Sequence, residues 1–221
     1  MTEHDPRPHS PVQPHQREPM FNIPFVPLIV AVGLVALYAM QGQLPDDGLA
    51  WGLRPIDLQH GHYSGLLTHM VVHGSWAHVL MNALGLIAFG SPVARDLSRG
   101  LGPAAWLAFF IIGGVFAGGV YALIHWGNAI PVVGASGAVF AMIGASLRLM
   151  AGPCLLIPLF HPVVMRGAFV WMAVNAVTGI FGGLLTGDGA AVAWEAHAAG
   201  FVAGIILVGP FHRFFGVKYV G

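Results

Sequence analysis

The chain has 221 residues and a formal net charge of +0, so its charge gives no reason to expect a nucleic-acid partner. Charged residues make up 8% of the chain and hydrophobic residues 56%, and the mean hydropathy is +0.74. Soluble proteins carry about 25% charged residues. The composition therefore excludes an ordinary soluble domain and predicts a membrane protein.

The first segment, residues 1–21, is polar and rich in proline, without a helical or strand period. We expect a disordered tail there. Its mixed charge, and the lack of a small-residue cleavage pattern after the next apolar run, indicate an uncleaved first helix rather than a signal peptide. Cys154 is the only cysteine, which excludes an intramolecular disulfide.

Six apolar windows follow, and each is long enough, or nearly so, to cross a hydrocarbon core that needs about 20 helical residues. They are Ile23–Gln41, Trp76–Val93, Pro103–Trp126, Gly134–Met150, Gly167–Leu185 and Ala190–Phe211. We therefore expect an all-α polytopic membrane protein, with a six-helix bundle over residues 22–215 and a short fourth helix. Residues 216–221 would form a C-terminal tail.

The basic residues predict how this bundle is oriented. Eight of the nine Lys and Arg residues fall on one side of the predicted spans, and Arg54 alone falls on the other. The eight are Arg7, Arg17, Arg95, Arg99, Arg148, Arg166, Arg213 and Lys218. Because basic loops stay in the cytoplasm, both termini are expected there, in a plasma (inner) membrane.

Counting along the spans then places several polar residues at one depth. Ser136 is 12 residues from Arg148 at the inner face, or about 18 Å along a helix. His197 and Asn82 each lie seven residues inside the outer ends of their spans. His78 lies one turn before Asn82 on the same helix face. Such residues are costly within a bilayer and usually mark function there.

These residue types suit acyl transfer. A serine hydroxyl becomes a strong nucleophile when an adjacent imidazole takes its proton, which His197 could do for Ser136. The Asn82 amide, the His78 ring and the Ser136 backbone N–H could stabilise the oxyanion that forms. Gly134 would allow close approach of backbone and substrate. This chemistry requires neither a metal nor a cofactor.

Helix packing is the alternative explanation of the same small residues. Glycines in membrane helices mostly serve close contact, and Gly200-x3-Gly204 is a common helix-contact pattern. Intramembrane serines often bond to the backbone of their own helix. Each motif alone is weak, and the joint occurrence at one depth is what favours catalysis.

Taken together, these motifs resemble the rhomboid intramembrane serine proteases, of the bacterial six-helix type. Gly134-Ala135-Ser136-Gly137 matches the G-x-S-G of that family, and His73-x4-His78-x3-Asn82 matches its second-helix signature. Ala196-His197-x2-Gly200-x3-Gly204 matches its sixth-helix signature. The similarity covers roughly residues 22 to 211.

The resemblance implies a Ser136–His197 dyad, oxyanion stabilisation by Asn82, His78 and the Ser136–Gly134 segment, and cleavage of single-pass membrane proteins near the outer membrane boundary. Substrates and membrane lipids are the implied partners. His69 and His73 match two further family histidines that support the first loop and the site. Gly137, Gly200 and Phe140 are expected to support it too; Phe140 replaces a frequent tyrosine but keeps a ring that can stack on His197.

This sequence departs from the family in its first loop, and two other functions stay open. The Trp-Arg pair common in the family is missing near Ser64-Gly65. One alternative is a catalytically inactive relative that binds membrane clients. The other is a redox protein in which His69, His73 and His78 bind a metal or haem.

Overall fold

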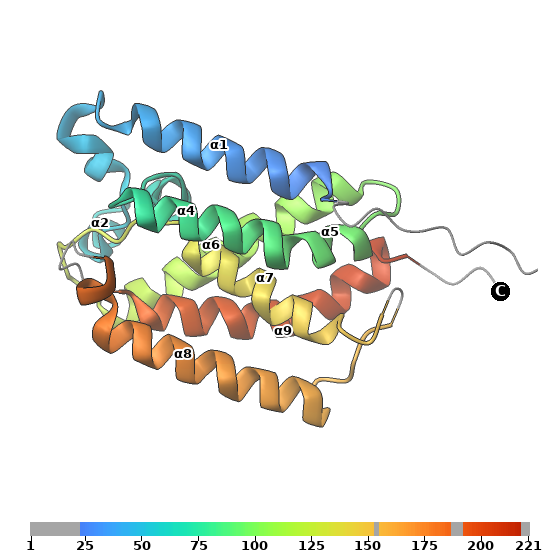
Figure 1. The fold of residues 1–221 in the computed structure, drawn as a ribbon. Coiled ribbons are helices and arrows are strands. Elements are labelled where there is room, and N and C mark those ends of the chain that lie inside the picture. The colour runs from blue at the N-terminus through green and yellow to red at the C-terminus, as the bar shows by residue number, and fades with distance from the viewer. Residues whose placement is uncertain (1–22, 153–154, 187–191, 218–221) are drawn as a thin grey trace, which may run out of the picture.

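The structure is a computed structural model that describes residues 23–152, 155–186 and 192–217. Figure 1 shows a bundle of helices that lie roughly side by side. They are α1 (Phe25–Gln41), the 3-10 helix η1 (Pro45–Trp51), α2 (Pro55–Gln59), α3 (Gly65–Thr68), the 3-10 helix η2 (His69–Val71), α4 (Trp76–Gly85), the π-helix η3 (Leu86–Gly90), α5 (Ser91–Asp96), α6 (Gly102–Ile124), α7 (Ser136–Arg148), α8 (Pro162–Thr186) and α9 (Trp194–Phe215).

The expected all-α polytopic membrane fold is confirmed. Four helical segments are long and apolar enough to cross a membrane: Trp76–Asp96, Gly102–Ile124, Pro162–Phe181 and Trp194–Phe215. Two shorter apolar helices, Phe25–Gln41 and Ser136–Arg148, complete the set of six. Within the described residues, the extended backbone forms a single isolated bridge, between Leu53 and Val132.

The helices present apolar side chains outward, as contact with lipid requires. Examples from five of the six are Ile29, Leu84, Ile112, Phe169 and Ile206, each between 44% and 75% exposed. The first and last described residues lie at the same end of the bundle (Figure 1), as an even number of crossings demands. The predicted tail over residues 1–21 and most of the one over residues 216–221 fall outside the described residues.

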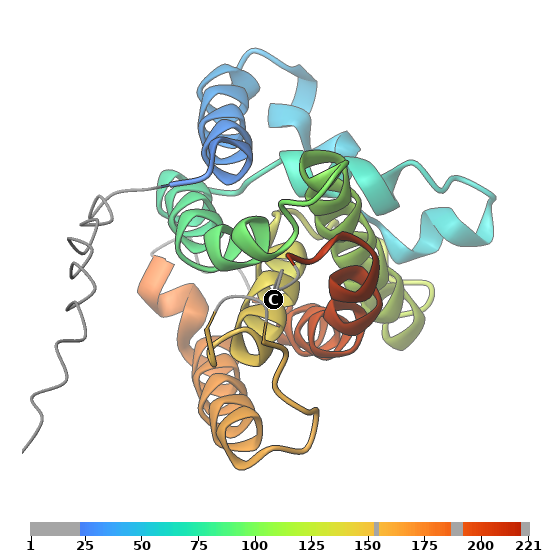
Figure 2. The same cartoon turned by 90° about the vertical axis from the view of Figure 1, so that its right-hand side faces the viewer.

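Helix α7 runs through the middle of the bundle (Figure 2), and ten of its 13 residues are buried. It lies against α9 at very short range, because the crossing is made by glycines. A Cβ added to Gly200 would overlap the Gly137 carbonyl oxygen, and one added to Gly204 would overlap the Ala141 carbonyl oxygen. The structure therefore places Gly137 and Gly200 in the contact between these two helices.

Five of the six predicted spans begin at other residues than expected. Helix α1 begins at Phe25 rather than Ile23, and α6 begins at Gly102 rather than Pro103. Helix α7 begins at Ser136, not Gly134, because Gly134 has φ +116°, outside the helical region. Helix α8 begins at Pro162, five residues before Gly167, since proline lacks an N–H and suits the first turn of a helix. Helix α9 begins at Trp194 rather than Ala190.

The loop between α1 and α4 is built from short helices that the sequence analysis did not predict. It contains η1, α2, α3 and η2, and it is fixed to the segment before α7 by paired bonds between Leu53 and Val132. Thr68 Oγ1 also donates to the Trp51 carbonyl, 2.6 Å away. Gly65, near the expected Trp-Arg pair, lies so close to the Gly52–Leu53 backbone that even a Cβ would be crowded at 3.0 Å.

Candidate active site

Ser136 and His197 lie in contact at the crossing of α7 and α9. Ser136 is the first residue of α7, and His197 is in the first turn of α9. Ser136 Oγ lies 2.7 Å from His197 Nε2, a hydrogen bond that joins residues 61 apart in the sequence. His197 is 8% exposed. The close glycine contact between the two helices is what allows these side chains to meet.

Phe140 covers one face of the His197 ring. The two rings are stacked, with centroids 4.4 Å apart and an interplanar angle of 8°. Phe140 is one turn after Ser136 on α7, so the same helix carries both the hydroxyl and the stacking ring. Phe140 also makes a T-shaped contact with Trp171 of α8, with ring centroids 6.3 Å apart and an interplanar angle of 84°. A phenyl ring without a hydroxyl thus suffices for the stacking.

Asn175 of α8 is a third polar contact, which the sequence analysis missed. Its Oδ1 lies 3.1 Å from His197 Nδ1, and its Nδ2 donates to the Trp194 carbonyl at 2.9 Å. The side chain is 1% exposed. A polar residue in the middle of an apolar span was a usable signal, since such residues are costly in a bilayer.

Two side chains of α4 approach the segment that leads into Ser136. Ser75 caps α4, its hydroxyl accepting from the His78 N–H at 3.2 Å, and this start places His78 and Asn82 on one helix face. A Cβ added to Gly134 would lie 2.5 Å from His78 Nε2 and 3.6 Å from Asn82 Nδ2. Glycine at 134 therefore lets the His78 ring pack directly against the backbone of this segment, with Asn82 next to it.

Asn82 Nδ2 is a buried donor with no hydrogen-bond partner within the described part of the chain. The backbone N–H groups of the first turn of α7 also lack partners within their own helix, as in any helix. Both kinds of donor lie around the entrance to α7. This is the environment that a developing negative charge requires.

His69 fixes the chain just before the serine. Its carbonyl accepts from the Gly134 N–H at 2.8 Å, and its Nδ1 donates to the Gly65 carbonyl at 2.8 Å. Burial lowers the pKa of the His69 ring, which keeps the ring neutral. A Cβ on Gly118 of α6 would lie 3.0 Å from His69 Cε1, so the ring also packs against α6.

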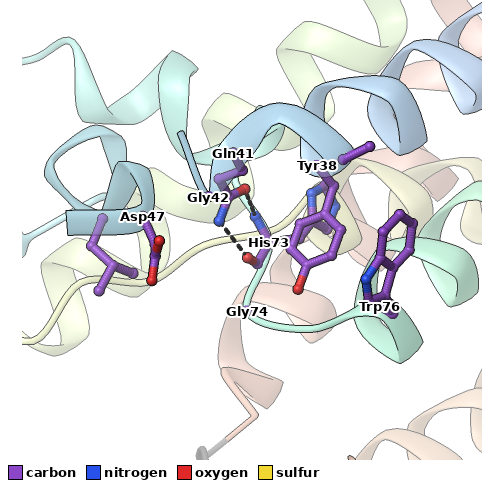
Figure 3. A pocket seen from close by; sticks show the side chains of 9 residues that line it. Tyr38, Gln41, Gly42, Asp47, His73, Gly74 and Trp76 are labelled. Atoms are coloured by element: carbon purple, nitrogen blue, oxygen red, sulfur yellow. Dashed lines mark hydrogen bonds between the residues drawn. The ribbon is translucent and has the colours of Figure 1, made fainter. Parts of the chain in front are cut away.

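The His73 ring makes a T-shaped contact with the His78 ring, and the ring centroids are 5.1 Å apart. Its backbone is held by the Gln41 side chain, which donates to the His73 carbonyl at 2.8 Å and accepts from the His73 N–H at 2.9 Å (Figure 3). Burial, and secondarily the nearby His78, lowers the pKa of His73 to about 3. Both predicted supporting histidines are thus neutral, buried residues of the first loop.

A cavity of about 410 Å³ opens beside His73, between the end of α1 and the start of α4. Figure 3 shows Tyr38, Gln41, Asp47 and Trp76 around it. Its lining does not include Ser136 or His197, so it is separate from the serine–histidine contact. It marks a hollow on the first-loop side of the His73–His78 pair.

The described residues offer no three-residue ligand set for the metal alternative. No three His, Cys, Asp or Glu side chains among them are grouped so as to hold a metal ion. His73 faces His78, whereas His69 is bonded to Gly65 and packs against α6.

Comparison with known proteins agrees with this arrangement. The Rhomboid domain family matches residues 60–214, well over half of the chain. A curated relative, "RHOMBOID-like protein 9, chloroplastic" of Arabidopsis thaliana, is 36% identical over 87 residues. That match covers 39% of this chain and 18% of the relative. The match to the Rhomboid domain family includes Gly134, Ser136 and His197, as well as the α4 residues that approach them. The chain belongs to the rhomboid family.

Proposed function

We propose that this protein is an intramembrane serine endopeptidase in which Ser136 is the nucleophile and His197 is the general base. The observation that carries the proposal is the 2.7 Å contact between Ser136 Oγ and His197 Nε2. A hydroxyl this close to an imidazole nitrogen can transfer its proton as the oxygen attacks a carbonyl. His197 is otherwise engaged only at its other ring nitrogen and at its stacked face among the contacts described above.

The reaction proceeds in two halves. Ser136 Oγ attacks the scissile carbonyl carbon while His197 Nε2 accepts the hydroxyl proton, and His197 then gives that proton to the leaving amine. The acyl group stays on Ser136. Water attacks the acyl carbon while His197 takes its proton; the bond from the acyl carbon to Ser136 Oγ then breaks, His197 returns the proton to Ser136 Oγ, and the new carboxyl terminus is released. No metal or cofactor enters either half.

The oxyanion of each tetrahedral intermediate would be bound by the Ser136 N–H, the Asn82 amide and the His78 ring. The Asn82 Nδ2 without a partner among the described residues, and the close approach of His78 and Asn82 to Gly134, support this role. The N-terminus of α7 adds the favourable end of its helix dipole. Donors that are fixed in advance stabilise the transition state more than the ground state.

The substrates we propose are single-pass membrane proteins, cut near the outer membrane boundary. A transmembrane helix shields its carbonyls with its own hydrogen bonds, so it must unwind locally before Ser136 can attack. The membrane we propose is the plasma membrane. The basic residues support an orientation with both termini in the cytoplasm and the α7 entrance on the outer side. Surrounding lipids contact the exposed apolar faces.

Cleavage of a tagged single-pass reporter in proteoliposomes tests the proposal. Ser136→Ala and His197→Ala should each lower kcat about 10³-fold or more. Ser146→Ala is the matched control on the same helix. Its hydroxyl donates to the Ile143 carbonyl of its own helix, so the variant should keep full activity.

Labelling by a fluorophosphonate probe, which needs no protein substrate, separates the proposal from the inactive client-binding alternative. Wild type should be labelled at Ser136, and His197→Ala should not. Folded wild type that neither cleaves nor is labelled would favour client binding instead.

A further inference from the structure

The buried amide of Asn175 is hydrogen-bonded at both ends. A carbonyl oxygen can only accept, so the Trp194 carbonyl must receive the Asn175 Nδ2–H at 2.9 Å. This bond sets which way the amide faces. Asn175 Oδ1 is then the atom directed at His197 Nδ1, 3.1 Å away.

An amide oxygen is an acceptor as well, so His197 Nδ1 must carry the proton of the neutral ring. The other ring nitrogen, Nε2, then has a free lone pair. That nitrogen is the one 2.7 Å from Ser136 Oγ. One carbonyl of α9 thus determines, through the Asn175 amide, which tautomer of His197 faces the serine.

The amide also restrains the ring in a way that stacking does not. Phe140 lies parallel to the His197 ring, but stacking is nearly the same for the two ring orientations that are related by a 180° turn about the Cβ–Cγ bond. Hydrogen bonds at Nδ1 and Nε2, on opposite sides of the ring, fix that rotation. Trp171, one turn before Asn175 on α8, makes a T-shaped contact with Phe140.

We propose that Asn175 is a positioning residue that holds His197 as the Nδ1–H tautomer, so that Ser136, His197 and Asn175 form one hydrogen-bonded chain. The inference rests on the proposed function, because a tautomer matters only if His197 acts as a base. Asn175 does not touch the substrate. Its loss should lower kcat and leave KM nearly unchanged.

Two substitutions separate positioning from packing. Asn175→Leu keeps the volume but has no acceptor, whereas Asn175→Asp keeps an acceptor oxygen for Nδ1–H. We expect Asn175→Leu to lower kcat at least about tenfold, with a parallel loss in the rate of fluorophosphonate labelling. Asn175→Asp should retain clearly more kcat than Asn175→Leu. A packing role predicts the reverse order, since the site is apolar and a carboxyl there is costly.

Thr178→Val is the control on α8. It removes a hydroxyl that bonds to the Asn175 carbonyl within the helix and leaves the His197 contact intact, so kcat should stay at the wild-type value. If Asn175→Leu is recovered unfolded by its thermal transition, Asn175→Ala removes the same acceptor and takes its place.

Wild-type kcat in the folded leucine or alanine variant, a loss confined to KM, or equal losses with Asp and Leu would each overturn the positioning role. Those outcomes leave the proposed function intact as long as Ser136→Ala is inactive. A reporter still cleaved by Ser136→Ala would instead overturn the proposed function itself.

Discussion

Two asparagine amides around Ser136 have opposite hydrogen-bonding states. Asn175 is bonded at its oxygen and at its nitrogen, which fixes it in place. Asn82 has a buried Nδ2 without a partner among the described residues. A buried donor left without a partner costs free energy in the resting protein. In the proposed function, this cost of Asn82 is recovered when a substrate oxyanion forms, which would favour the transition state over the ground state.

Replacing Asn82 with alanine should therefore separate activity from stability. We expect kcat to fall about 10²- to 10³-fold, the range for loss of one oxyanion donor, with the thermal midpoint unchanged or raised. Reporter cleavage and thermal unfolding of the same preparation would check both. A lowered thermal midpoint that accounts for the lost activity would mean that Asn82 is structural.

The residues around Ser136 differ in how well the sequence revealed them. Ser136, His197, His78 and Asn82 lie in motifs with fixed spacing, so counting along helices brought them to one depth. Asn175 lies in a span whose other residues are apolar except Thr178, and its neighbours depend on how α8 packs against α9. Sequence periodicity contains no information on that contact, because α8 is apolar on all sides.

The α7–α9 pair is the element that determines the geometry of the site. The six spans followed from apolar length alone, but the helices of the first loop did not, since each is too short to show a period. Nor did the sequence reveal that Arg148, taken as a mark of the inner face, binds the carbonyls of Ile157 and Ile205. That side chain ties the end of α7 to α9, opposite the glycine contact.

Gly200→Ala should separate α7 from α9. The added methyl group would overlap the Gly137 carbonyl, and forced overpacking of this kind typically costs about 1–3 kcal/mol. Because Ser136 and His197 sit on the two helices, activity should fall together with the thermal midpoint. Gly119→Ala on α6 is the control: nothing lies within 4 Å of its added Cβ, so it should be neutral or slightly stabilising.

At the scale of the whole molecule, the first loop and the bundle are joined through buried histidines. The His69 carbonyl accepts a hydrogen bond from the Gly134 N–H. The side chain of Gln41, at the end of α1, bonds to both the N–H and the carbonyl of His73. Both rings are kept neutral by burial, with the pKa of His73 lowered from 6.5 to about 3. Unfolding would expose these rings to water and let them take up protons.

Stability should therefore fall as the medium is acidified. Between pH 6.5 and about 3 the unfolded chain binds a proton at His73 that the folded protein excludes, so the free energy of unfolding decreases as pH falls. Thermal unfolding in detergent across this range would show it. His73→Gln should flatten part of the slope, with the remainder due in part to His69. An unchanged slope in that variant would exclude His73 as a source.

The shortness of α7 has a consequence for the bilayer itself. Thirteen helical residues span about 20 Å, less than a hydrocarbon core of about 30 Å, so the extended chain that precedes Ser136 must lie at membrane depth. Lipid cannot form hydrogen bonds with exposed peptide groups. In this stretch, Val132 is paired with the Leu53 backbone, and the Gly134 N–H donates to the His69 carbonyl. The first loop thus supplies the hydrogen bonds that water would otherwise make to this backbone, so that α7 can begin below the membrane surface.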